Sequence, residues 1–168
     1  MLIQCVVESV RVHTLTGQHV VMLQPKDTPD RFLPIWVGAD QAASIAAQLA
    51  GIHPDRPLTH DLMIDILGKV GAEITRVVVR DLIESGDGQG VFHGSIFIQA
   101  GGSEVEIDSR ASDAIALALR CDAQILVADS VLDRSASRPD GELGAVEHDE
   151  LSIFRQFIQT LPDDPASG

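Results

Sequence analysis

The chain has 168 residues, enough for one domain with a substantial buried core. Hydrophobic residues make up 45% of it but aromatic residues only 4%, so we expect a core packed mainly from aliphatic side chains. The formal net charge of −13 argues against tight non-specific binding to nucleic acid or anionic membranes, because both repel an acidic surface. No apolar run reaches the roughly 18 residues of a membrane-spanning helix, so no membrane contact is expected.

The cysteines and the first residues indicate a cytoplasmic protein. Cys5 and Cys121 are the only cysteines and have no spacing typical of a metal or redox site, so we expect reduced core thiols, with a disulfide between them as the alternative. The segment Met1–Val10 lacks a cationic start and contains Glu8, unlike a secretory signal.

The first third of the chain predicts three strands and a helix. The predicted elements are strands at residues 3–12, 19–24 and 32–37 and a helix from Asp40 that Gly51 ends. Pro34 lacks a backbone N–H, which places the third strand at an edge or a bulge. Trp36 is expected to be a core or interface anchor.

A second helix is predicted to begin at Thr59, acting as N-cap, and to end at Gly71. Its apolar residues share one face: Leu62, Met63, Ile66, Leu67 and Val70. Further strands are expected at residues 74–82, 92–99, 104–109 and 124–128, with a helix from about Ser112. Residues 133–146 are rich in Ser, Asp, Gly and Pro and indicate a flexible linker, followed by a helix at 147–161 and a frayed tail at 162–168.

An internal repeat emerges when the chain is shifted by 72 residues. Val6 and Val7 then fall on Val78 and Val79, and Ile35 falls on Ile107. Both halves predict three strands and then a helix, which favours an internal duplication. Hairpins followed by helices predict an α+β fold with a largely antiparallel, curved, barrel-like sheet, and a C-terminal helix is added to it.

The segment from Glu104 to Arg120 predicts a strand that runs almost directly into a buried helix. Glu104, Glu106 and Asp108 alternate with Val105 and Ile107 along the strand. An apolar helix follows, so the polar turn between the two elements is held on a rigid corner. Such a corner is a suitable place for a functional site.

Three segments together resemble the bifunctional nuclease domain family. They are Leu33-Pro-Ile-Trp-Val-Gly38, Arg56-Pro-Leu-Thr-His-Asp61 and Ile107-Asp-Ser-Arg-Ala-Ser-Asp-Ala114, and the resemblance covers residues 1–132. It implies an α+β fold, assembly into a homo-oligomer, and hydrolysis of RNA and DNA. Two positions depart from the family's usual pattern: Ala111 stands where proline is common, and Gln41 where glutamate is common.

Phosphodiester hydrolysis needs an activated water and neutralisation of phosphate charge, often by carboxylate-bound Mg²⁺ or Mn²⁺. The candidate metal ligands are Asp108 and Asp113, with Glu106 as a third. The alternative is that Glu106 lies on a solvated strand face and Asp113 only favours a helix N-terminus through the helix dipole.

Arg110 can clamp a phosphate with its planar guanidinium, or it can pair with Asp108 or Asp113 and stabilise the corner. Ser112 is expected to be a helix cap, and its candidate functional role is contact with the substrate. It is not expected to be a nucleophile, because no residue nearby in the sequence can be identified as its base. Arg56 contacts phosphate if its loop lines a cleft, and otherwise forms a weak surface ion pair.

His60 and Asp61 begin the second predicted helix and are candidate catalytic residues. A histidine titrates near neutral pH and can act as a general base or bind a metal. Ordinary capping chemistry explains the same residues without catalysis. The sequence thus predicts a metal-dependent nuclease, if His60 and Asp113 converge on one pocket. The alternative is a non-enzymatic oligomeric module that binds a ligand or a protein.

Overall fold

The computed structural model describes residues 1–13, 16–84, 90–136 and 146–147. The strands are β1 (Leu2–His13), β2 (His19–Pro25), β3 (Leu33–Val37), β4 (Ala72–Glu84), β5 (Gly90–Ala100), β6 (Ser103–Arg110), β7 (Gln124–Ala128) and β8 (Val146–Glu147). The helices of these residues are α1 (Ala39–Leu49), α2 (Thr59–Lys69), α3 (Ala111–Cys121) and α4 (Asp129–Ser135). The fold is α+β, as predicted.

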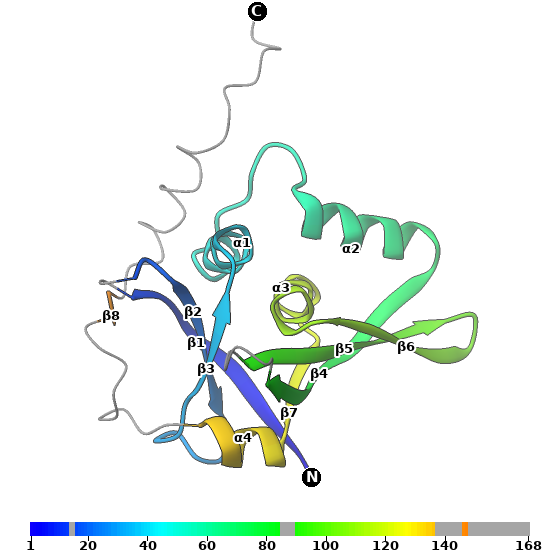
Figure 1. Ribbon diagram of the computed structural model, residues 1–168. Coiled ribbons are helices and arrows are strands. Elements are labelled where there is room, and N and C mark those ends of the chain that lie inside the picture. Colours follow the sequence, from blue (N-terminus) through cyan, green and yellow to red (C-terminus); the bar gives the residue numbers. More distant parts are fainter. Residues whose placement is uncertain (14–15, 85–89, 137–145, 148–168) are drawn as a thin grey trace, which may run out of the picture.

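One curled sheet forms half a barrel around two helices (Figure 1). Its strand order is β3-β2-β1-β7-β4-β5-β6, and β8 pairs with the end of β1. All neighbours are antiparallel except β4 and β7, which are parallel. The prediction of a largely antiparallel, curved sheet is therefore confirmed.

The two halves of the sheet repeat one β-β-β-α unit. β1, β2, β3 and α1 form the first unit and β4, β5, β6 and α3 the second, with β7 joining them. The helices α1 and α3 begin at Ala39 and Ala111, which are separated by the predicted shift of 72 residues. The pairing register of β1 is interrupted between Val7 and Ser9, and that of β4 between Val79 and Asp81. These two interruptions are also 72 residues apart. Shared bulges at equivalent positions support a duplicated unit.

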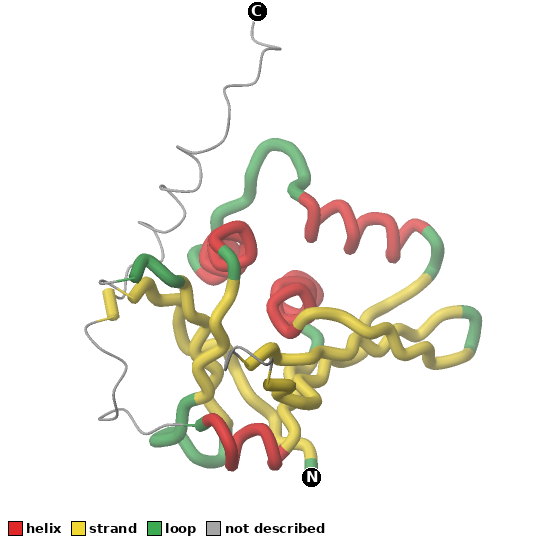
Figure 2. The backbone as a smooth tube through the Cα atoms, viewed as in Figure 1, coloured by secondary structure: helices red, strands yellow, loops and turns green. Residues whose placement is uncertain are grey.

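The helices α1 and α3 lie side by side in the concave face of the sheet (Figure 2). Their buried faces are built largely from alanine, which lets helix and strand backbones approach closely. The largest fully buried side chains are aliphatic, among them Leu33, Ile35, Ile45 and Leu117. The prediction of an aliphatic core is confirmed.

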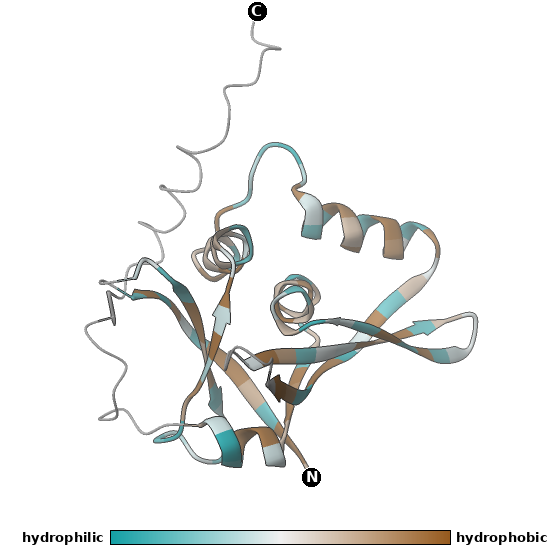
Figure 3. Ribbon diagram, in the orientation of Figure 1, coloured by the Kyte–Doolittle hydropathy of each residue, from teal (hydrophilic) through white to brown (hydrophobic). Residues whose placement is uncertain are grey.

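The helix α2 lies at the rim of this core and packs against α3. Its one buried residue is polar, His60. The predicted apolar face is largely exposed: Leu62, Met63, Ile66 and Val70 keep 41–71% of their surface. Hydrophobic colour along α2 marks this exposed stripe in Figure 3. In the described part of the chain no helix has the length and apolar character needed to cross a membrane.

Several local predictions differ from the structure. Trp36 is 44% exposed on the face of β3 opposite the buried Leu33 and Ile35, so it is not a core residue, and its alternative role as an interface anchor stays a prediction. Residues Asp133–Ser135 belong to α4 and not to a linker. The predicted helix at 147–161 and the tail at 162–168 lie outside the described residues, apart from Glu147 in β8. Both cysteines are free thiols, and burial raises the pKa of Cys5 to about 11.

Candidate functional site

The corner between β6 and α3 has no loop, as the sequence predicts. Arg110 ends the strand in extended geometry (φ −69°, ψ 146°) and is also the N-cap of α3, which starts at Ala111. On the neighbouring strand, Gly94 allows this turn to approach β5. A Cβ at Gly94 would lie 3.1 Å from Cα of Ala111 and 3.1 Å from Oγ of Ser109. Close packing therefore fixes the direction in which the first turn of α3 presents its side chains.

The first turns of α2 and α3 converge. Nε2 of His60 lies 3.2 Å from Oδ1 of Asp113, although the residues are far apart in the chain. The His60 side chain is only 9% exposed, whereas Asp113 keeps 25% of its side chain accessible. The structure thus brings together the two residues on which the predicted composite site depends.

Asp113 also holds Arg110. Nε of Arg110 donates to Oδ2 at 2.6 Å and Nη2 donates to Oδ1 at 3.0 Å. Burial works to raise the pKa of Asp113, but hydrogen bonds from Arg110 and His60 and the positive charge of Arg110 outweigh it and lower that pKa. Arg110 remains 62% exposed, so its outer N–H groups can reach a ligand.

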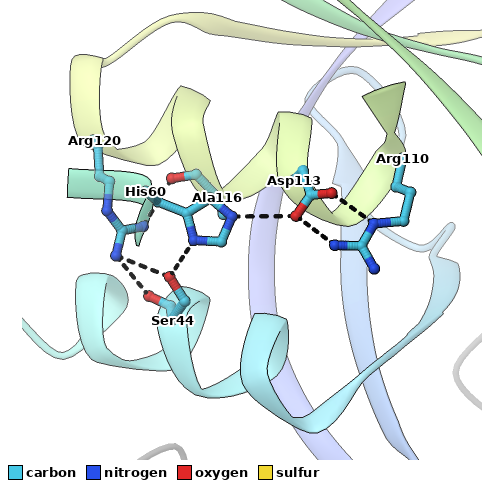
Figure 4. Close-up of polar contacts among 6 residues, drawn as sticks. All are labelled: Ser44, His60, Arg110, Asp113, Ala116 and Arg120. Carbon is cyan, nitrogen blue, oxygen red and sulfur yellow. Dashed lines mark hydrogen bonds and ion pairs between the residues drawn. The ribbon is translucent and has the colours of Figure 1, made fainter. Parts of the chain in front are cut away.

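Behind His60, a buried chain of hydrogen bonds orients the imidazole (Figure 4). Nδ1 of His60 lies 2.9 Å from Oγ of Ser44 on α1, and Nη2 of Arg120 donates to the same oxygen at 2.9 Å. If Nε2 carries the proton toward Asp113, Ser44 donates to Nδ1 and accepts from Arg120, so every group in the chain is satisfied. Second partners of this kind fix a histidine's tautomer and orientation.

Asp61 faces this buried chain rather than the outer corner. Its Oδ1 accepts from Nε of Arg120 at 2.5 Å, and its Oδ2 accepts from the N–H of Leu58 at 2.9 Å. Burial works to raise the pKa of Asp61, but these hydrogen bonds and the Arg120 charge lower it. Leu58, not Thr59, is the N-cap of α2, and Asp61 supplies the capping contact. Asp61 therefore positions α2 and Arg120.

Ser44 and Arg120 were absent from the predicted site. Arg120 is 7% exposed and joins Asp61 to Ser44, so it connects all three helices around His60. The one sequence signal was an arginine in the last turn of an otherwise apolar helix. Ser44 gave no signal, because it lies among alanines and its partner comes from another helix.

Of the other predicted residues, Asp108 lines the same groove as His60 and Asp113, whereas Glu106, Ser112 and Arg56 are outside its lining. Glu106 accepts from Ser95 at 2.8 Å and pairs with Arg80 at 2.5 Å on the strand face. Asp108 is exposed at the rim, and Arg56 is exposed and outside the groove lining. Ser112 is buried in the first turn of α3 and is not its N-cap, so its expected capping role is wrong.

The residues described here contain no group of three or more His, Cys, Asp or Glu side chains placed to hold one ion. Both oxygens of Asp113 already accept from Arg110 and His60, and Glu106 is held by Arg80 and Ser95. The candidate ligands Glu106, Asp108 and Asp113 therefore do not fit a preformed metal site.

A groove runs past the His60–Asp113 contact. Its volume is about 870 Å³, and residues from α1, α2, β6 and α3 line it. Its floor includes apolar side chains such as Ile96 and Leu117, and its polar wall carries Ser44, His60, Arg110 and Asp113. A molecule in this groove would touch the apolar side of α2 and the polar corner at once.

Comparison with known proteins identifies the family. A family model described as the bifunctional nuclease domain matches residues 21–140. The chain belongs to the bifunctional nuclease domain family. It is 34% identical over 164 residues to uncharacterized proteins from two strains of Mycobacterium tuberculosis, covering 94% of each chain. It is 24% identical to bifunctional nuclease 2 of Oryza sativa subsp. japonica over 84% of this chain and 50% of that protein. Bifunctional nuclease 1 of the same subspecies is 25% identical over 74% of this chain and 38% of its own length.

Two of the three segments that resemble the bifunctional nuclease family line the groove, Arg56–Asp61 through residues 57–60 and Ile107–Ala114 through residues 107–110 and 113. Leu33–Gly38 leads into α1, Arg56–Asp61 leads into α2, and Ile107–Ala114 forms the corner. Gln41, which replaces a common family glutamate, lines the groove at the position equivalent to Asp113 in the repeat. Ala111, which replaces a common proline, is buried against β5. The two units are therefore chemically unequal, and the ion pair of Arg110 with Asp113 belongs to the second.

Proposed function

We propose that this chain hydrolyses phosphodiester bonds in RNA or DNA. The observation that supports the proposal best is the contact between His60, Asp113 and Arg110 on the wall of the groove. Membership of a family whose plant relatives are named bifunctional nucleases supports the reaction class. The groove is in the size range of small-molecule sites, about 300–1,000 Å³.

The chemistry rests on competition for Arg110. A substrate phosphate presents the same paired oxygens as Asp113, and Arg110 is exposed enough to turn toward it. Asp113 then keeps its contact with His60. Oδ2 of Asp113, freed from Arg110, can then accept a proton from the attacking water, while Nε2 of His60 donates to Oδ1 and Ser44 holds Nδ1; the leaving oxygen takes its proton from solvent.

A divalent cation is a further part of the proposal, as Mg²⁺ or Mn²⁺ would neutralise phosphate charge. The described residues offer no preformed ligand set, so such a cation would have to arrive with the substrate. Asp108, exposed at the rim of the groove, is the residue most open to a cation brought in by the substrate.

Cleavage of labelled single-stranded RNA and DNA tests the proposal, in Mg²⁺, Mn²⁺ and chelator. Loss of general acid–base catalysis typically costs about 10²–10⁴-fold, so His60→Ala and Asp113→Asn should lower the rate by at least about 100-fold. His53→Ala and Asp65→Asn are matched controls, since both residues are exposed and outside the groove lining. Equal cleavage by wild type, His60→Ala and Asp113→Asn would refute the assignment.

One observation favours the rival function, an oligomeric binding module. The apolar stripe of α2, formed by Leu62, Ile66 and Val70, is exposed at one-helical-turn spacing. Such a stripe usually marks an interaction surface. We propose that a second copy of the chain covers it.

A further inference from the structure

A second pocket lies beside the first turn of α3, and Arg110 lines both it and the groove. Its volume is about 350 Å³. Its walls come from the end of β3, the turn into β2, the start of β5 and the first residues of α3. The pocket is therefore built between the two repeated units and shares Arg110 with the groove.

Among the described residues that line this pocket there is no aspartate or glutamate, although the whole chain carries a net charge of −13. Its polar side chains are those of Gln18, His19, Arg110 and Ser112. Burial lowers the pKa of His19, so at neutral pH this residue offers hydrogen bonds and no charge. Arg110 is the cation of the pocket, which makes it suited to an anionic ligand.

The first turn of α3 supplies a place for that anion. Ala111 and Ser112, the first two residues of this 11-residue helix, line the pocket. Unpaired N–H groups and the helix dipole favour negative charge at such a position. Ser112 is 8% exposed and lines the pocket, and no hydrogen bond of its hydroxyl is seen within the described part of the chain. An anionic oxygen in the pocket would give this hydroxyl an acceptor, and hydrogen bonds to charged groups are stronger than neutral ones.

The rest of the pocket lining is mainly apolar and aromatic. Trp36 is 44% exposed and lines it together with Val91 and Phe92. The indole touches His13 edge-on, with ring centroids 6.2 Å apart. An exposed indole beside an anion site is the combination that binds a base and its phosphate.

We propose that this pocket binds one nucleotide unit of the substrate, with phosphate at Ser112 and Arg110 and the base against Trp36. The inference rests on the proposed nuclease function, because Arg110 would then lie between the held nucleotide and the groove where cleavage occurs. Binding and cleavage depend on different side chains, Ser112 and Trp36 for the first and His60 for the second. The two can therefore fail separately.

Titration of the full chain with AMP tests the inference. Trp36 is the only tryptophan and there is no tyrosine, so fluorescence excited at the indole reports on this pocket alone. AMP should quench it saturably, and inorganic phosphate should compete with AMP. Adenosine should bind at least about tenfold more weakly, as expected for loss of hydrogen bonds to a charged group. Absence of saturation, or equal affinity for AMP and adenosine, would overturn the proposal.

Variants then locate the site by calorimetry. Ser112→Ala should weaken AMP binding about tenfold, and Trp36→Ala should weaken it at least about fivefold. Ser103→Ala, at an exposed serine of β6, is the matched control and should bind as wild type does. His60→Ala should keep AMP binding while losing cleavage. Wild-type affinity in both Ser112→Ala and Trp36→Ala would place the nucleotide elsewhere.

Discussion

At the scale of single residues, the site depends on how the carboxylate of Asp113 is shared. Two cationic or proton-donating neighbours, Arg110 and His60, converge on it, and they lower its pKa against the opposing effect of burial. A lowered pKa means that the folded state binds this proton less readily than the unfolded chain does. The stabilisation is therefore present above the ordinary aspartate value and is lost as the pH falls through the lowered one.

We expect Asp113→Asn to be less sensitive to acid than wild type. Urea unfolding at pH 6 and pH 3 should show a larger loss of unfolding free energy in wild type, because asparagine has no proton to gain below about pH 4. Asp65→Asn is the control, since Asp65 is exposed on α2 and has no ion pair among the described residues. Its pH dependence should follow wild type. Parallel acid sensitivity of wild type and Asp113→Asn would contradict the shared-carboxylate account.

At the scale of elements, the direct junction of β6 and α3 fixes the site. The backbone of this corner lies against Gly94 of β5, with no room for a side chain. Moving the corner by a few tenths of an ångström would also move Asp113 relative to His60, which comes from another element. Strand packing therefore bears on the geometry of the candidate site.

Gly94→Ala should destabilise the fold by about 1–3 kcal/mol, the usual cost of overpacking a core. The added Cβ would lie 3.1–3.2 Å from the backbone of Ala111, which a flexible side chain cannot relieve. Gly68→Ala is the matched control: nothing lies within 4 Å of its added Cβ, and alanine favours a helix. Thermal and urea unfolding should show Gly68→Ala unchanged or more stable. A Gly94→Ala variant as stable as wild type would show that the corner is not tightly held.

At the scale of the whole molecule, the duplicated unit explains both what the sequence predicts and what it misses. Alternating and helical hydrophobic patterns, together with the 72-residue repeat, predict the order of the elements and the curved sheet. The strand-to-helix corner at Arg110 is also predictable, because it depends only on residues adjacent in the sequence. The approach of His60 to Asp113 was a hypothesis that only tertiary packing decides. Ser44 and Arg120 could not be predicted, because their contact exists only where α1 and α3 lie side by side. The spacing of Leu62, Ile66 and Val70 indicates an apolar helix face. Whether other parts of the chain cover this face depends on tertiary packing, which the spacing does not show.

The homo-oligomer stays a prediction, and α2 is where we expect its interface. Light scattering of the full chain should give a mass at least twice 18.0 kDa. Ile66→Glu should shift it toward the monomer, because it places a charge in the centre of the exposed stripe. Lys69→Glu, in the same helix and also exposed, controls for added negative charge. A wild-type mass of one chain would overturn this assignment.

The most direct test of the central claim, that His60 and Asp113 act as one catalytic unit, is a double-mutant cycle on cleavage rate. Single-turnover cleavage of one labelled oligonucleotide would be measured for wild type, His60→Ala, Asp113→Asn and the double variant. Residues that act as a unit give strongly non-additive losses, so the double variant should be no slower than the slower single variant. Losses that simply multiply would show that the two residues work independently, and the 3.2 Å contact would then have no catalytic meaning.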